Sequence, residues 1–109
     1  MSTYTPDSWA PVLIESDKYG KVYKILASWY GGYAGSDYWK LSSGVESITV
    51  SEDGKLTMPQ ASGSVYVVGG QPHVSMLMGA VFADFEKQAE ENGFTIKMID
   101  VADLLEAFK

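Results

Sequence analysis

Two short runs of strand-forming residues around an Asp-Gly pair constrain the fold of this chain more than any other feature. In SGVESITVSEDGKLTMP, the run Val45–Ser51 is rich in β-branched residues, and Lys55–Met58 follows directly after Asp53-Gly54. Asp-Gly supplies the positive φ angles of a tight hairpin turn, and β-branched side chains fit a pleated sheet. The segment therefore predicts an antiparallel hairpin, and an all-helical fold is not expected.

Further strands are expected before and after this hairpin. Every second side chain of Lys21–Tyr30 is apolar or aromatic, which is typical of a half-buried strand. Ser64–Val68 is a nearly continuous apolar run, which indicates a strand buried on both faces. DYWKL at residues 37–41 and FTIKMI at residues 94–99 are expected to add short strands.

Helical spacing replaces this alternation after the Gly-Gly pair at residues 69–70. Apolar residues recur at helical intervals over Ser75–Asn92, and the Asn-Gly pair at its end is a strong helix stop, so a long helix is expected there. Asp100 is expected to cap a short C-terminal helix, with Asp103 as its capping-box partner. The apolar stripe of this last helix consists of Val101, Leu104, Leu105 and Phe108.

The order of these elements predicts the fold class. Strands in succession, followed by helix, strand and helix, favour an α+β domain. We expect a single domain over residues 1–109, with one antiparallel sheet of about four to six strands and both helices packed on one of its faces. Residues 1–20, which contain Pro6 and Pro11, are expected to form an extended N-terminal arm with one short strand around Val12–Glu15.

The charged residues argue against nucleic acid as a direct partner. The net charge is −6, and all eight cationic side chains are lysines. Arginine is the preferred side chain for phosphate and guanine, and affinity for nucleic acid comes largely from cations along the backbone. The acidic surface could instead face a basic partner protein, or it could serve solubility alone.

The sequence predicts a soluble cytoplasmic protein without membrane attachment. It contains no cysteine, so disulfides and thiolate sites are excluded. No apolar run approaches the ~20 residues that span a bilayer. The N-terminal stretch MSTYTPDSWAP lacks the basic and apolar regions of a signal peptide.

No catalytic or metal-binding motif stands out in the sequence. His73 is the single histidine, and one histidine without cysteine leaves none of the usual structural zinc sets. No spacing resembles a calcium loop or a G-x-S-x-G nucleophile elbow. Because a lone histidine in a loop is more often solvated than catalytic, we expect no enzyme, no cofactor and no metal. An enzyme that uses His73 is the least favoured class.

The stretch VVGGQPHVSM offers a candidate ligand site because it runs from a strand through Gly-Gly to a helix. The N-terminus of a helix has free N–H groups that can bind an anion. The stretch has neither a P-loop lysine nor a dinucleotide fingerprint. It is therefore either a tight turn or a pocket near Gly69, Gly70 and His73 that sequesters a small ligand or nucleotide signal without cleaving it.

Five large aromatic residues surround the glycines of ASWYGGYAGSDYWKLSSG at residues 27–44. Adjacent strand residues face opposite sides. One residue of each adjacent pair, at residues 29–30 and 38–39, is therefore expected to point away from the core. Tyr and Trp anchor many interfaces, and mixtures of Tyr, Gly and Ser form adaptable binding loops. The candidate partner-binding residues are Tyr30, Tyr33, Tyr38 and Trp39. Because tryptophan gains more from burial than tyrosine, Trp29 and Trp39 are expected to pack inside, which leaves open whether Trp39 belongs to the interface or the core.

The run YWKLSSGVESI, followed by SGSVYVV, is similar to segments of small uncharacterised proteins that bacteriophages encode. Those proteins often carry a Trp-basic-Leu-Ser-Ser-Gly segment and then a Gly-Ser-Val-Tyr strand, and the similarity covers Ser28–Val68. The resemblance implies an anti-defence accessory protein that binds and disables a host protein in the host cytoplasm. It carries over no catalytic residue. The expectation is thus a non-enzymatic protein-binding or inhibitor protein, which could also form homo-oligomers, with the small-ligand binder as the alternative.

Overall fold

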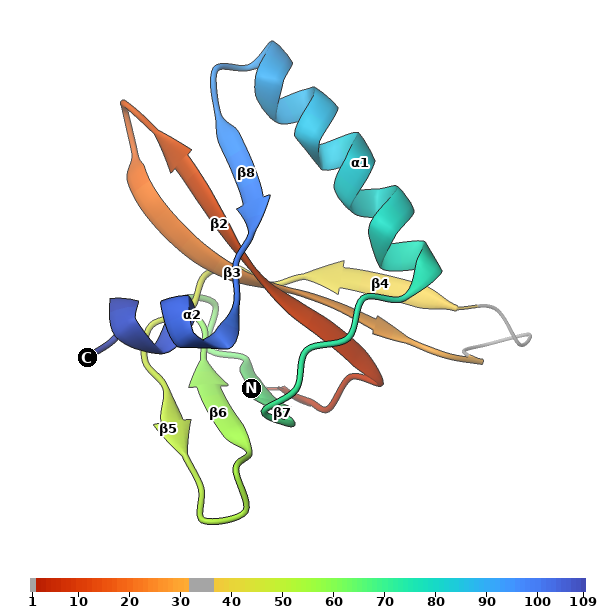
Figure 1. Cartoon of the computed structure of the whole chain (residues 1–109), viewed down its shortest axis with the longest axis vertical. Helices are drawn as coiled ribbons and strands as arrows, with labels where there is room; N and C mark the ends of the chain where they lie inside the picture. The colour runs from red at the N-terminus through yellow and green to blue at the C-terminus, as the bar shows by residue number, and fades with distance from the viewer. Residues whose placement is uncertain (1, 32–36) are drawn as a thin grey trace.

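Two four-stranded sheets and a long helix build one α+β domain, whose computed structural model describes residues 2–31 and 37–109 (Figure 1). The central sheet is antiparallel and has the order β4 (Tyr38–Leu41), β3 (Gly20–Trp29), β2 (Ser8–Ser16) and β8 (Thr95–Met98). The outer sheet has the order β1 (Thr3–Tyr4), β7 (Val65–Val68), β6 (Leu56–Pro59) and β5 (Thr49–Val50), in which β1 is parallel to β7. The helices are α1 (Met76–Glu91) and α2 (Val101–Ala107). The expected α+β class is confirmed, whereas the expected single sheet is in fact two sheets.

The N-terminal segment supplies a central strand that includes the short strand expected around Val12–Glu15 but is longer, and residues 8–16 are part of the sheet rather than of an extended arm. β2 lies between β3 and β8, and its residues 8–13 are buried. The Pro11 carbonyl oxygen accepts a hydrogen bond from the Ile99 N–H (3.0 Å), so it points away from β3. Because the nitrogen of a strand residue points to the same side as its carbonyl, the Pro11 nitrogen also points away from β3. On that side the ladder with β8 begins only at Val12. The missing N–H of proline therefore costs no ladder bond to β3.

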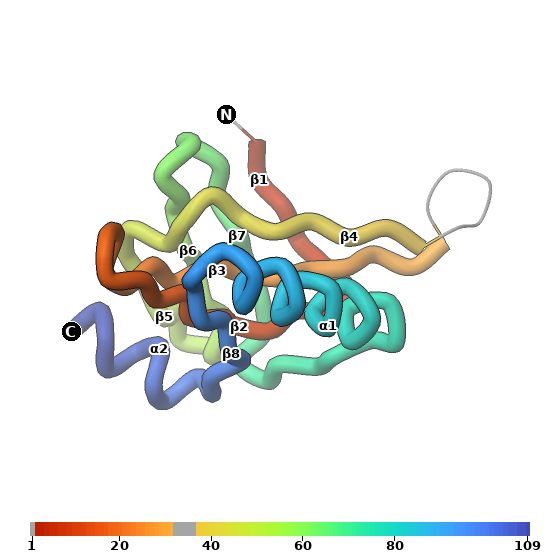
Figure 2. Tube along the Cα trace, turned by 90° about the horizontal axis from the view of Figure 1, so that it is seen from above, coloured from red at the N-terminus to blue at the C-terminus, as the bar shows by residue number. Residues whose placement is uncertain are grey.

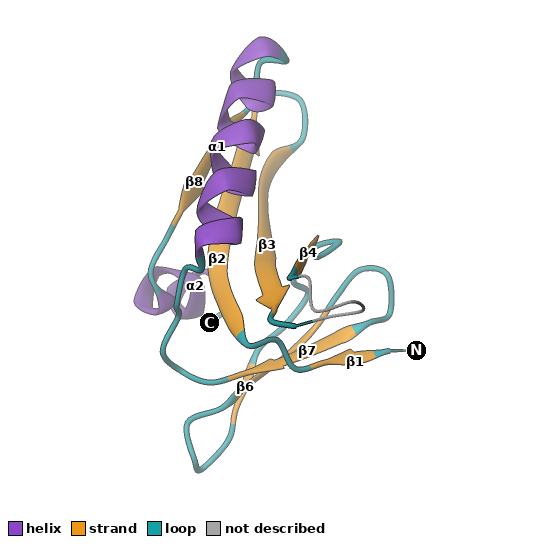
Figure 3. Ribbon diagram, turned by 90° about the vertical axis from the view of Figure 1, so that its right-hand side faces the viewer, coloured by secondary structure: helices purple, strands orange, loops and turns teal. Residues whose placement is uncertain are grey.

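The central sheet is covered on both faces, by the outer sheet and by α1 (Figure 3). The buried side chains between the two sheets, joined by one from α2, are Trp9, Ile25, Ala27, Val45, Leu56, Met58, Tyr66, Val68 and Leu104. The buried side chains between the central sheet and α1 are Ala10, Val12, Leu26 and Met78. Since α1 and α2 contribute to opposite faces of the central sheet, the expectation that both helices pack on one face is wrong.

Both helices begin at a capping residue, which is Ser75 for α1 and the predicted Asp100 for α2. The Ser75 Oγ accepts a hydrogen bond from the Met78 N–H (3.2 Å) and lies 2.8 Å from the Ser28 Oγ, which fixes the start of α1 to β3. The Asp100 carboxylate accepts a hydrogen bond from the Asp103 N–H (2.8 Å) at the start of α2. Neither helix in the described part of the chain is long and apolar enough to cross a membrane.

The predicted hairpin forms β5 and β6 of the outer sheet. Gly54 has a φ of +84°, and its N–H donates a hydrogen bond to the Ser51 carbonyl oxygen (3.0 Å). A positive φ at this turn position favours glycine. The pairing of the first run is limited to Thr49–Val50, with an isolated bridge between Val45 and Gln60. The hairpin is therefore confirmed with a shorter first strand than expected.

Candidate functional site

The strand β4 forms one edge of the central sheet, and its side chains are largely exposed. Figure 2 shows β3 and β4 reaching out together to one side of the molecule. Tyr38 and Trp39 lie on opposite faces of the sheet because successive strand residues alternate. They are 50% and 42% exposed. This edge therefore presents a large aromatic side chain on each face, next to backbone groups that can pair with another strand.

On the face toward the outer sheet, three aromatic rings form a row. Tyr38 stacks on Trp29 with their ring centroids 5.0 Å apart and their planes 7° from parallel. Trp29 in turn meets Tyr4 edge to face at 6.0 Å. Trp29 is half-buried against the core between the sheets. The row thus connects the exposed Tyr38 to the interior through rings that hold one another in place.

On the opposite face, Trp39 lies against α1. Its ring meets that of Phe85 edge to face, with the centroids 5.4 Å apart. The expectation that Trp39 packs inside is wrong, because a residue of an edge strand has a neighbouring strand on one side only and remains exposed on the other. Its membership of the candidate partner-binding set is consistent with this exposure.

Tyr30 follows the end of β3 and is held in place by polar contacts. Its hydroxyl lies 2.6 Å from the Ser8 Oγ, and its N–H donates a hydrogen bond to the Asp7 carboxylate (2.8 Å). The side chain is nevertheless 50% exposed. Tyr30 therefore adds a third exposed aromatic side chain, next to the end of β3 where Trp29 pairs with Tyr38 of β4. Tyr33, the remaining candidate of the partner-binding set, lies outside the described residues.

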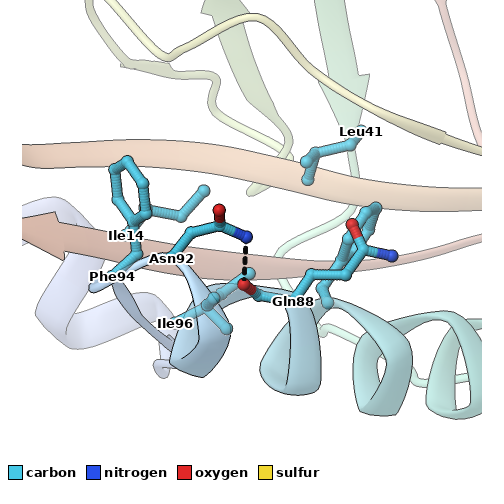
Figure 4. Close-up of a pocket in the computed structure, with 8 residues that line it drawn as sticks. Ile14, Leu41, Gln88, Asn92, Phe94 and Ile96 are labelled. Carbon is cyan, nitrogen blue, oxygen red and sulfur yellow. Dashed lines mark hydrogen bonds between the residues drawn. The ribbon is translucent and has the colours of Figure 1, made fainter.

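An apolar groove of about 280 Å³ lies beside Trp39, between α1 and the central sheet (Figure 4). It is lined by Ile14, Leu41, Phe85, Gln88, Ala89, Asn92, Phe94 and Ile96. Phe85 belongs both to this groove and to the contact with Trp39, so the groove continues the aromatic surface of β4. The sequence identifies Phe85 only as an apolar helix residue. The groove itself depends on how α1 and the sheet lie against each other.

The Gly69-Gly70 turn is tied to the fold by several contacts. The Trp9 Nε1–H donates a hydrogen bond to the Gly69 carbonyl oxygen (3.0 Å), and the His73 N–H donates one to the Trp9 carbonyl oxygen (3.0 Å). A Cβ on Gly70 would lie 3.0 Å from the Gly54 carbonyl oxygen, so the absence of a side chain lets the hairpin turn approach. These contacts give the three candidate ligand-binding residues structural roles. The apolar groove is lined by other residues.

Comparisons with protein-family models, curated proteins and solved structures find no match for this chain. Within residues 2–31 and 37–109, no three histidine, aspartate or glutamate side chains gather where they could hold a metal ion. The function must therefore be inferred from the geometry of β4 and of the groove beside it.

Proposed function

We propose that this protein is a non-enzymatic binding protein that docks onto another protein through the edge strand β4. The observation that carries the proposal is the exposure of Tyr38 and Trp39 on opposite faces of this edge, with Tyr30 beside them. Tyrosine and tryptophan are enriched among the residues that dominate the binding energy of interfaces. An exposed strand edge can also pair its free backbone groups with an extended segment of a partner.

The surroundings of Trp39 define the chemistry of the partner segment. The apolar groove next to Trp39 has room for an apolar side chain. The helix α1, which Trp39 contacts through Phe85, carries the exposed carboxylates of Asp84, Glu86, Glu90 and Glu91 along its length, with Glu86 and Glu90 on the side of β8. Complementary charge across an interface accelerates association and excludes wrong partners. We therefore expect an extended segment in which an apolar anchor is flanked by basic residues.

A bacterial host protein is the partner that we propose. Residues 28–68, which include β4, resemble the small bacteriophage proteins described above, and inhibition of a host defence protein in the host cytoplasm fits that resemblance. An accessory role of this kind needs only a tight docking surface. Pairing of two β4 edges in a homodimer would be the competing use of the same surface.

Capture from a bacterial lysate tests this proposal at the level of residues. The unmodified protein is compared with the double variant Tyr38→Ser/Trp39→Ser and with Tyr19→Ser. Tyr19 is an aromatic control outside β4, because it is 64% exposed and lies in the turn between β2 and β3, where its ring stacks on Phe94 at the groove and not on a residue of β4. We expect the unmodified protein and the control to capture the same protein in stoichiometric amount. The double variant should bind it at least about tenfold more weakly, since each lost anchor costs more than ~1 kcal/mol.

Two results would contradict docking through β4. One is capture that survives in the double variant, and the other is an equal loss in Tyr19→Ser. Sedimentation of the purified protein separates self-association from docking on a partner. A concentration-dependent dimer that the double variant abolishes would assign β4 to pairing between copies of the chain.

A further inference from the structure

A polar cavity of about 240 Å³ lies where β4 and the residues that follow it meet β1 and β7. Its lining includes the side chains of two lysines, several serines and two tyrosines, and no carboxylate. This composition is unusual for a chain with a net charge of −6. The cavity lies apart from the apolar groove, with which it shares only Leu41 in its lining.

The two lysines of the cavity are Lys24 and Lys40. Neither has a carboxylate within ion-pair distance among the residues that the structure describes. The Lys40 Nζ lies 5.3 Å from the centroid of the Tyr4 ring, a contact that directs the ammonium group toward one face of the tyrosine. Two unpaired cations in one cavity create a local positive potential that attracts anions.

Two serines of the cavity accept hydrogen bonds from backbone N–H groups. The Ser42 Oγ accepts a hydrogen bond from the Ile25 N–H (2.8 Å), and the Ser43 Oγ accepts one from the Ser62 N–H (2.9 Å). A serine hydroxyl that accepts a backbone N–H still has its own hydrogen to donate. The hydroxyl groups of Ser42 and Ser43 are therefore fixed in place and can donate to an acceptor in the cavity.

The hydroxyl of Tyr66 has an unmet hydrogen-bonding requirement. Tyr66 lines the cavity and is only 1% exposed, and its hydroxyl has no hydrogen-bond partner in the described ranges 2–31 and 37–109. An unpartnered buried hydroxyl is costly. Burial, with a smaller contribution from Tyr4, raises the pKa of Tyr66 to about 12, so the group keeps its proton near neutral pH and acts as a donor.

We propose that this cavity binds a small ligand through a phosphate group, with Lys24, Lys40 and the Tyr66 hydroxyl as the principal donors. Ammonium groups and hydroxyl donors without a competing carboxylate match the acceptor oxygens of a phosphate. The volume of about 240 Å³ is below the range of about 300–1,000 Å³ that is usual for drug-sized ligands. The ligand is therefore a free phosphate or a small phosphomonoester. This inference does not depend on docking through β4.

Isothermal titration in a phosphate-free chloride buffer tests the proposal with three probes: inorganic phosphate, adenosine monophosphate and adenosine. We expect inorganic phosphate to bind, and adenosine to show no binding. Tighter binding of adenosine monophosphate than of inorganic phosphate would identify a phosphomonoester as the ligand, and equal or weaker binding would identify free phosphate.

Two variants assign the binding to this cavity. Tyr66→Phe removes only the unpartnered hydroxyl and keeps the ring, and Lys40→Met removes one cation; each should raise the Kd for phosphate at least fivefold. Lys21→Met is the matched control, because Lys21 is an exposed lysine of β3 outside the cavity lining, and it should leave the Kd within twofold. The proposal is overturned if inorganic phosphate does not bind at millimolar concentration, if adenosine binds as well as its monophosphate, or if either cavity variant changes the Kd less than fivefold.

Discussion

The two faces of the central sheet differ in how completely they are covered. Toward the outer sheet, a continuous cluster of buried side chains joins both sheets and α2. Toward α1, the buried cluster is smaller, and an open groove remains beside it. A helix is about 10–12 Å wide, whereas a four-stranded sheet with strands about 4.8 Å apart is wider than that. One helix therefore leaves part of this face uncovered, and the edge strand β4 with Trp39 lies at that part.

This difference separates a face that is closed by buried side chains from a face on which a groove remains open to a protein partner. The covered face holds Trp9 and Tyr66, whose side chains are almost completely buried. The partly covered face holds Trp39 and the apolar groove. Residues of the same type should therefore respond differently to substitution, depending on the face on which they lie.

The largest effect is expected for Trp9→Ala on the covered face. Trp9 is 3% exposed, and its Nε1–H donates a hydrogen bond to the Gly69 carbonyl oxygen. Loss of a buried tryptophan usually costs about 3–5 kcal/mol of unfolding free energy. Urea denaturation measures this loss, with Trp39→Ala as the matched control, which should cost about 1 kcal/mol or less. Equal losses in the two variants would show that the two faces do not differ as described.

A smaller effect is expected from the ionisation of Tyr66 at high pH. Burial raises the pKa of Tyr66 from 10.0 to about 12, so the unfolded chain releases this proton at lower pH than the folded protein. The stability contributed by the neutral hydroxyl is therefore present below pH 10 and is lost as the pH rises toward 12. The loss should reach about 2 kcal/mol near pH 11.5, at 1.36 kcal/mol per pKa unit.

Tyr66→Phe isolates this contribution because the other tyrosines remain in both proteins. The difference in unfolding free energy between this variant and the unmodified protein is measured at about pH 8 and at about pH 11.5. It should grow by about 2 kcal/mol in favour of the variant. A difference that does not change with pH would mean that the Tyr66 hydroxyl is open to solvent, and the covered face would then be less closed than described.

The smallest effect on stability is expected for the contact that fixes α1 to the partly covered face. Ser75→Ala removes the cap of α1 and the contact with the Ser28 hydroxyl. Loss of a helix cap typically costs about 1 kcal/mol. A double-mutant cycle with Ser28→Ala measures the coupling between the two hydroxyls. A coupling near zero would show that the helix is held by its apolar contacts alone.

Local features of this fold could be predicted from the sequence, whereas features that join distant segments could not. The hairpin around Gly54 and the cap Asp100 each depend on a few neighbouring residues, and both are present as predicted. The sequence predicts only the part of β2 around Val12–Glu15, because Pro11 suggests an interruption before it. Whether a proline fits into β2 depends on where the pairing with β8 ends, and β8 lies far away in the sequence.

The candidate sites show the same limit. Strand alternation predicts that Tyr38 and Trp39 lie on opposite faces, and both are exposed because β4 is an edge. The position of β4 at the edge is a property of the strand order, which no local pattern contains. The polar cavity likewise brings Lys24 together with Lys40 and Tyr66 from three separate strands. Nothing in the spacing of these residues indicates that they meet.

Photo-crosslinking from position 39 tests most directly whether the uncovered edge is the docking surface. A photoreactive phenylalanine analogue replaces Trp39 in one variant and Tyr19 in another, since both positions are exposed but Trp39 lies on β4 and Tyr19 lies in the turn between β2 and β3. Irradiation in a bacterial lysate should join position 39 to one partner protein and leave position 19 without that product. Crosslinks of the partner to position 19 and not to position 39 would contradict docking through β4.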